Sequence, residues 1–189
     1  LAFTVHRKPL IFFDAAGNVP YATTDWSGTV SVWLRLAPET ELQPGFSDPV
    51  QIMGRAWNDA AFFVEFEKTP TAVPFRLGAY ADLAVWNPTG RRFQDIPGSE
   101  RPLVTVNDPP FAGDRWTHVV FTFEHFNTGR SDGLARLYLD GRSAGDIAAR
   151  GSKVRDLQQA EDLVIGPLAV ELDLRVLVSR AQGLDGREP

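Results

Sequence analysis

Alternation of apolar and polar residues with a period of two dominates this chain of 189 residues. In the run 29–36, valines and leucines occupy one face, while Thr, Ser, Trp and Arg occupy the other. The runs 116–123 and 135–140 repeat the alternation, and the second ends at Asp140-Gly141, a pair typical of two-residue hairpin turns. Because successive side chains of a strand point to opposite faces, these runs predict strands with one apolar face.

Further short apolar runs extend the pattern along most of the chain. They lie at 50–55, 60–67, 75–80, 83–86, 103–106, 163–165 and 172–178, separated by Pro, Gly, Asn and Asp. Only the stretch 152–161 has a weak helical pattern, which predicts at most a short surface helix. No linker, change of composition or internal repeat divides the chain, so we expect a single domain over 1–189. The spacing of strands and breakers predicts an antiparallel sandwich or barrel.

Composition excludes several classes of function. The 24 acidic residues outnumber the 19 basic ones, which argues against a nucleic-acid partner. The absence of cysteine excludes a disulfide scaffold, a thiolate zinc site and a cysteine nucleophile. No apolar run approaches the roughly 20 residues that span a bilayer, so no membrane insertion is expected. The chain begins at Leu1 without a leader pattern, and we expect a mature form or a piece of a longer protein with flanking domains.

Five stretches together resemble one family. They are GTVSVWLRL at 28–36, DRWTHVVFT at 114–122, ARLYLDG at 135–141, LVIG at 163–166 and ELDLRVLVSRA at 171–181. In this order they resemble the strands of the laminin-G-like and pentraxin-like branch of the concanavalin A-like lectin/glucanase superfamily. The resemblance implies an all-β fold, a two-sheet antiparallel jelly-roll sandwich with one concave sheet. The chain departs from the family in lacking a terminal disulfide and in carrying a long insertion between residues 87 and 110.

Glu171 and Asp173 are the candidate catalytic residues. They lie two apart on one predicted strand and resemble part of the E-x-D-x-(x)-E strand of laminarinase-type glycosidases. The third acid of that pattern is missing, because Arg175 and Val176 stand where it would be. A retaining glycosidase needs two carboxyl groups about 5–5.5 Å apart. A glycoside hydrolase or polysaccharide lyase of the same fold is kept as an alternative to a non-catalytic domain.

His118 lies in the predicted strand at 116–123 and is expected to be a packed, hydrogen-bonded structural histidine.

Ligand binding is predicted at aromatic residues in loops. Trp57 lies in a turn between two strands, flanked by Arg55 and Asn58, and Trp86 and Tyr80 are the next candidates. Trp33 and Trp116 lie in predicted strands and are expected to be core or sheet-packing residues, and most other aromatic residues are expected to lie in the core of the sandwich.

Calcium is a candidate cofactor, because the resemblance implies loop oxygen ligands. Asp59, Asn107 and Asp108 are candidate metal ligands, although Asp and Asn are also ordinary turn residues. The leading hypothesis is a non-catalytic module that recognises carbohydrate, or a protein surface, as an accessory domain of a larger secreted or surface protein outside the cytoplasm. A structural spacer with no ligand is the remaining alternative.

Overall fold

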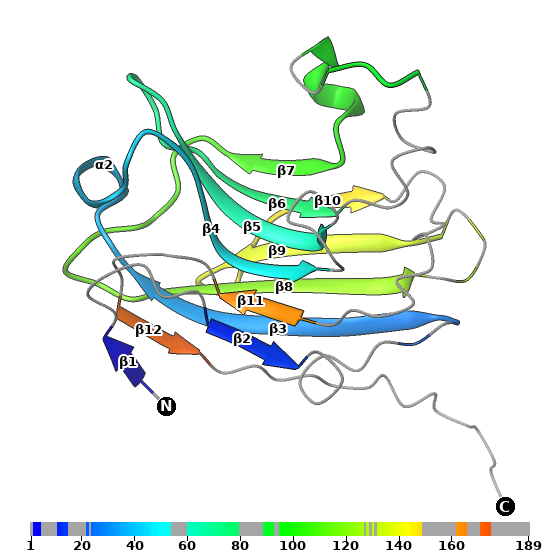
Figure 1. Cartoon of the computed structure of the whole chain (residues 1–189), viewed down its shortest axis with the longest axis horizontal. Coiled ribbons are helices and arrows are strands. Elements are labelled where there is room, and N and C mark those ends of the chain that lie inside the picture. The colour runs from blue at the N-terminus through cyan, green and yellow to red at the C-terminus, as the bar shows by residue number, and fades with distance from the viewer. Residues whose placement is uncertain are drawn as a thin grey trace, which may run out of the picture.

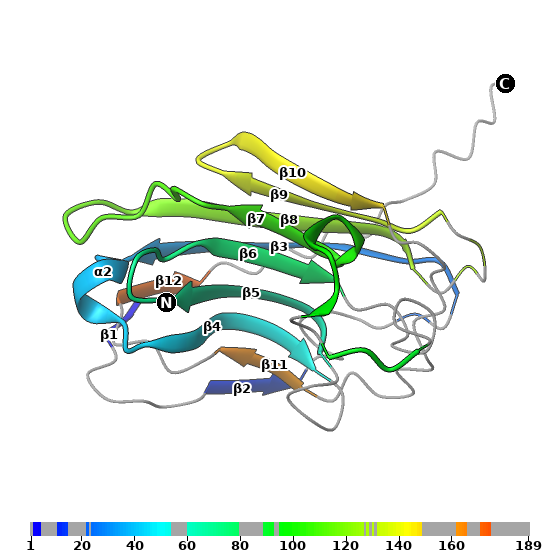
Figure 2. The ribbon, with the colours of Figure 1, turned by 90° about the horizontal axis from the view of Figure 1, so that it is seen from above.

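In the computed structural model, the described residues form two antiparallel sheets of six strands each. The structure describes residues 2–4, 11–14, 22, 24–53, 60–79, 89–92, 95–126, 128, 130, 132–148, 162–165 and 171–174. Sheet A has the order β1 (Ala2–Thr4), β12 (Glu171–Leu174), β3 (Trp26–Arg35), β8 (Thr117–Phe126), β9 (Leu134–Leu139), β10 (Arg142–Ala148). Sheet B has the order β2 (Ile11–Asp14), β11 (Asp162–Ile165), β4 (Gly45–Met53), β5 (Ala60–Lys68), β6 (Phe75–Ala79), β7 (Leu103–Val106). Both sheets follow these orders in Figure 2, and Figure 1 shows β4, β5 and β6 bent along their length. The predicted jelly-roll sandwich is confirmed.

The core lies between the apolar faces of the two sheets. In β3, Val30, Val32 and Leu34 are fully buried, as the alternation predicts. Aromatic rings fill much of the space: Phe62 of sheet B lies with its ring centroid 4.3 Å from Phe123 of sheet A. The expectation that most Phe residues serve the core is confirmed for the described ones, where Phe62, Phe66, Phe75, Phe121, Phe123 and Phe126 are fully buried.

Local turn chemistry agrees with the sequence at the hairpin between β9 and β10. Asp140 and Gly141 have φ of 49° and 75°, the left-handed values that a type I′ turn requires at both central positions. The short helix α2 (Pro38–Glu41) begins at Pro38. Proline suits this position because its missing N–H would have no intrahelical partner there. A 3₁₀ turn, η3 (Gly98–Glu100), precedes β7.

Two edge strands have no counterpart in the predicted pattern. β1 and β2 contain three and four residues and pair with β12 and β11, so that segments from the two ends of the sequence meet in each sheet. Runs this short hold too few residues for alternation to be distinguished from chance. The predicted surface helix at 152–161 and the predicted strand at 83–86 lie outside the described residues.

Candidate functional site

The outward face of sheet B carries the candidate site. In β5, Phe62, Val64 and Phe66 point into the core, and the alternate residues Phe63, Glu65 and Glu67 point away from it. In β6 the core residues Phe75 and Leu77 leave Arg76 and Gly78 on the outward face. Although they face outward, Glu65 is only 8% exposed and Arg76 only 5%. Charged groups this well buried need partners, and the neighbouring strands provide them.

A β-bulge in β4 brings a third charged group to this face. Ser47 pairs with Phe66 and Val50 with Val64, so three steps along β4 match two steps along β5. The extra residue lies at Asp48-Pro49, opposite Glu65. Proline fits a bulge because it cannot donate a ladder hydrogen bond. The bulge places Asp48 where its side chain hydrogen-bonds Glu65 and Gln51.

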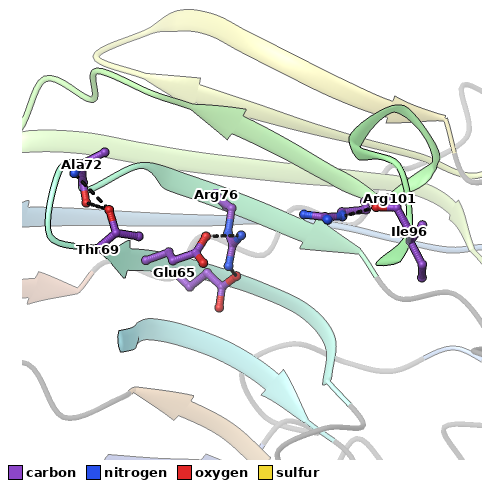
Figure 3. Close-up of polar contacts among 7 residues, drawn as sticks. Glu65, Thr69, Ala72, Arg76, Ile96 and Arg101 are labelled. Carbon is purple, nitrogen blue, oxygen red and sulfur yellow. Dashed lines mark hydrogen bonds and ion pairs between the residues drawn. The ribbon is translucent and has the colours of Figure 1, made fainter. Parts of the chain in front are cut away.

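Arg76 holds the acidic residues together. Its Nη2 lies 2.5 Å from Glu65 Oε1, and its Nη1 lies 2.6 Å from Glu67 Oε2. Figure 3 shows Arg76 extended beside Glu65, with dashed lines marking the ion pairs. The Glu65 pair follows from register, because Glu65 and Arg76 are directly opposite each other in the β5–β6 ladder. The buried Nε of Arg76 has no hydrogen-bond partner among the described residues.

Asp48 and Glu65 both have a raised pKa. Burial raises the pKa of Glu65 from 4.5 to about 7; Arg76 opposes this rise, and the charge of Asp48 adds to it. Burial also raises the pKa of Asp48, while side-chain hydrogen bonds with Glu65 and Gln51 partly lower it. The two carboxyl groups are coupled, so their titration belongs to the pair. Near neutral pH the pair therefore exchanges a proton, a property that suits either hydrogen bonding to a hydroxyl group or acid–base chemistry.

An exposed aromatic ring borders the charged group. Phe46 pairs with Glu67 across the β4–β5 ladder and is 63% exposed. It is the only large hydrophobic side chain that is exposed in the described part of the chain. The guanidinium carbon of Arg76 lies 5.3 Å from the centre of the Phe46 ring, which is a cation–π distance. The site thus offers one exposed apolar surface beside a cluster of hydrogen-bonding groups.

Phe63 lies on the same outward face of β5, two residues before Glu65. Its ring lies directly over Gly78, where a Cβ atom would be 2.0 Å from Phe63 Cζ. Gln51 pairs with Phe63 from the other side and is 8% exposed. Only glycine at position 78 leaves room for the ring in this position.

The loop before β7 is held by backbone-directed contacts. Arg101 Nε donates to the carbonyl oxygen of Ile96 at 2.8 Å, and Ile96 itself is 1% exposed. Figure 3 shows this contact and, at the opposite end of β6, the turn in which Thr69 and Ala72 hydrogen-bond each other. These contacts fix both ends of the β5–β6–β7 segment that carries Glu65 and Arg76.

Most of the site residues predicted from the sequence lie outside the described residues: Arg55, Trp57, Asn58, Asp59, Tyr80 and Trp86. Asn107 and Asp108 are exposed residues that follow β7. Glu171 and Asp173 lie in β12 of sheet A, where their backbone pairs with β3; their side chains lie outside the described part. Within that part, no group of three or more His, Cys, Asp and Glu side chains could hold a metal ion.

His118 lies on the outward face of sheet A, away from this site. Its Nε2 lies 2.8 Å from Ser31 Oγ, and its ring stacks on Trp33 with the centroids 4.5 Å apart. Both contacts agree with the expected packed, hydrogen-bonded role. In the described part of the structure, no helix has the length and hydropathy that a membrane crossing requires.

Six residues of this site are not predicted from the sequence pattern: Phe46, Asp48, Gln51, Glu65, Glu67 and Arg76. One signal was present: in 62–67, Glu65 and Glu67 alternate with Phe and Val, so both belong on the polar face of a predicted strand. Such a pattern usually marks an ordinary solvated face. The near-complete burial of Glu65 and Arg76 depends on contacts between strands that the sequence does not reveal.

No family model and no curated protein matches this chain. Among solved structures, it is similar to the endo-β-1,4-glucuronan lyase from the fungus Trichoderma reesei, with 16% identity, a TM-score of 0.52, and coverage of 91% of this chain and 74% of that one. It is also similar to the CBM40 module of the Ruminococcus gnavus IT-sialidase bound to α2,3-sialyllactose, with 8% identity, a TM-score of 0.51, and coverage of 95% and 91%. The same module bound to α2,6-sialyllactose gives 8% identity, a TM-score of 0.50 and coverage of 95% and 92%. At these identities the likeness establishes the sandwich fold.

Proposed function

We propose that this chain is a carbohydrate-binding jelly-roll domain whose ligand lies on the outward face of sheet B. The observation that carries the proposal is the combination of a buried, ion-paired polar cluster with the exposed ring of Phe46. Ligand sites typically join apolar and aromatic surface to a few fixed polar groups. A pyranose ring presents an apolar face and a rim of hydroxyl groups, and Phe46, Gln51 and Asp48 offer partners for both.

Relatives in fold support a carbohydrate ligand. One is a lyase named for glucuronan, and another is a module bound to sialyllactose. We further propose that the domain serves as an accessory module of a larger secreted or surface protein, with flanking domains. A protein surface as the ligand, and a spacer with no ligand, are the competing outcomes of the binding experiment.

Binding can be tested with an array of oligosaccharides followed by calorimetry on the best ligand. We expect binding that Phe46→Ala and Glu65→Gln each weaken by at least about tenfold, the range expected when a central interface contact is lost. Glu124→Gln is the matched control, because Glu124 pairs with Arg136 in a similar but more exposed ion pair on sheet A. Unchanged binding in both site variants would refute this location. Absence of binding to every oligosaccharide on the array would refute the carbohydrate ligand.

The coupled carboxyl groups favour a second function, a glycoside hydrolase or polysaccharide lyase. A buried glutamic acid with a pKa of about 7 is matched to proton transfer at neutral pH. Incubation with a panel of polysaccharides distinguishes the two. New reducing ends indicate cleavage, and unsaturated sugar products separate a lyase from a hydrolase. Loss of cleavage in Glu65→Gln would place the catalytic site on sheet B, and loss of cleavage in Glu171→Gln would place it at β12.

Calcium remains a proposed cofactor that follows from the family resemblance. Its predicted ligands include Asp59, Asn107 and Asp108. Calorimetric titration with calcium, followed by glycan binding in the presence and absence of a chelator, tests it. We expect heat of binding and a weaker glycan interaction after chelation, and equal affinity under both conditions would contradict the proposal.

A further inference from the structure

From its charges, we infer that the site on sheet B selects an uncharged polysaccharide and rejects polymers of sugar acids. This inference rests on the proposed function and specifies the class of its ligand. It concerns the carboxylate-bearing sugars, such as uronic and sialic acids, and their neutral counterparts with the same linkage. The two classes differ in one group, the carboxylate of the acidic sugar. A protein distinguishes them chiefly by whether its site carries positive or negative charge next to that group.

The cations on the described strands of sheet B already have hydrogen-bond or ion-pair partners. In the described strands of sheet B the only cationic side chains are Lys68 and Arg76. Lys68 Nζ donates to the carbonyl oxygens of Glu39 and Leu42, at 2.7 and 2.6 Å, at the end of the sheet. Both terminal nitrogens of Arg76 are bound to glutamate oxygens. Arginine recognises a carboxylate most strongly as a two-pronged pair through two of its three nitrogens, and the third nitrogen of Arg76, Nε, is buried away from a ligand.

Negative charge exceeds positive charge at the centre of the face. Asp48, Glu65 and Glu67 surround the single charge of Arg76. Even when Asp48 and Glu65 share one proton, the pair keeps one negative charge, and Glu67 adds a second. The cluster therefore has a net negative charge near pH 7.5. A ligand carboxylate placed there meets repulsion in a partly buried environment, where water screens it weakly.

The remaining groups of the site suit a neutral sugar. Carboxylates and the amide oxygen of Gln51 accept hydrogen bonds from hydroxyl groups, and a protonated carboxyl group can also donate one. The ring of Phe46 is 63% exposed beside the cluster and offers an apolar surface to the C–H face of a sugar. Repulsion between unit charges about 5 Å apart at the surface corresponds to roughly 100-fold in affinity, and salt reduces it. We therefore expect discrimination of at least about tenfold.

Matched ligand pairs test the inference directly. Calorimetry at pH 7.5 compares hexasaccharides of β-1,4-glucose with those of β-1,4-glucuronic acid, and hexamers of mannose and galactose with their uronic acid counterparts. We expect a neutral member to bind at least about tenfold more tightly than its acidic partner, at physiological salt. Tighter binding of an acidic member that Phe46→Ala weakens would overturn the inference and leave the proposed function standing. No binding to any member would overturn both.

Glu67→Gln supplies the decisive variant. It removes one negative charge and releases Nη1 of Arg76, while the Arg76–Glu65 pair remains. We expect the affinity for the acidic hexamer to rise about tenfold relative to its neutral partner. Glu124→Gln removes the same charge from sheet A and should leave the ratio within about twofold. An unchanged ratio in Glu67→Gln, or an equal change in the control, would show that this cluster does not set the selectivity.

Discussion

Replacing Glu65 with glutamine is expected to change how the stability of the protein depends on pH. The side chain is 11% exposed, and burial raises its pKa from 4.5 to about 7. Between these values the folded chain binds more protons than the unfolded chain. The free energy of unfolding of the wild type therefore falls as pH rises through this window. The favourable contribution is complete below pH 4.5 and lost above pH 7.

The magnitude follows from the size of the shift. A change from 4.5 to about 7 corresponds to about 3 kcal/mol over the whole window, of which about 2–3 kcal/mol falls between pH 5 and pH 8. Glutamine resembles the protonated acid and does not titrate. The difference in unfolding free energy between Glu65→Gln and the wild type should therefore grow in favour of the variant by about 2–3 kcal/mol from pH 5 to pH 8.

Urea unfolding at several pH values measures this difference, and thermal melts provide a second readout. For a chain of this size the growing difference corresponds to about 4–12 °C in relative midpoint temperature. Effects of the substitution that do not depend on pH cancel, because only the change with pH is compared. The ion pair with Arg76 and the coupled titration of Asp48 are part of the measured change. Parallel pH profiles for Glu65→Gln and the wild type would refute the assigned burial and coupling of the pair.

Three further predictions concern packing. Gly78→Ala places a Cβ atom 2.0 Å from Phe63 Cζ and should destabilise the protein by about 1–3 kcal/mol in urea unfolding. Gly98→Ala is the control and should be neutral, because no atom lies within 4 Å of the added Cβ. Equal effects of the two substitutions would contradict the assigned position of the Phe63 ring. Phe62→Ala, which removes a ring stacked on Phe123, should cost about 3–5 kcal/mol, while Phe46→Ala should change stability by less than about 0.5 kcal/mol. A large stability loss in Phe46→Ala would mark a packing role. Ser31→Ala removes the hydrogen-bond partner of His118 and should cost about 1 kcal/mol without altering glycan binding, and weakened binding would place a ligand on sheet A.

Much of the fold could be predicted because period-two patterning is a local property of the chain. The buried faces of Val30, Val32 and Leu34 and the turn at Asp140-Gly141 require no knowledge of distant residues. The site was harder to predict from the sequence. An aromatic residue in a predicted loop, such as Trp57, indicates a ligand contact by its residue type alone. Glu65 and Arg76, in contrast, follow the ordinary pattern of polar residues in a strand.

The sequence by itself therefore determined the sandwich, its apolar faces and the placement of most aromatic rings in the core, since burial of alternating side chains dictates them. Tertiary structure alone decided that Asp48, Glu65 and Arg76 meet. They come from three strands, and their contact depends on the β5–β6 register and on a one-residue bulge in β4. Register and bulge position are set by the packing of whole sheets. Desolvation of the cluster then raises the pKa values of Asp48 and Glu65, which no local pattern encodes.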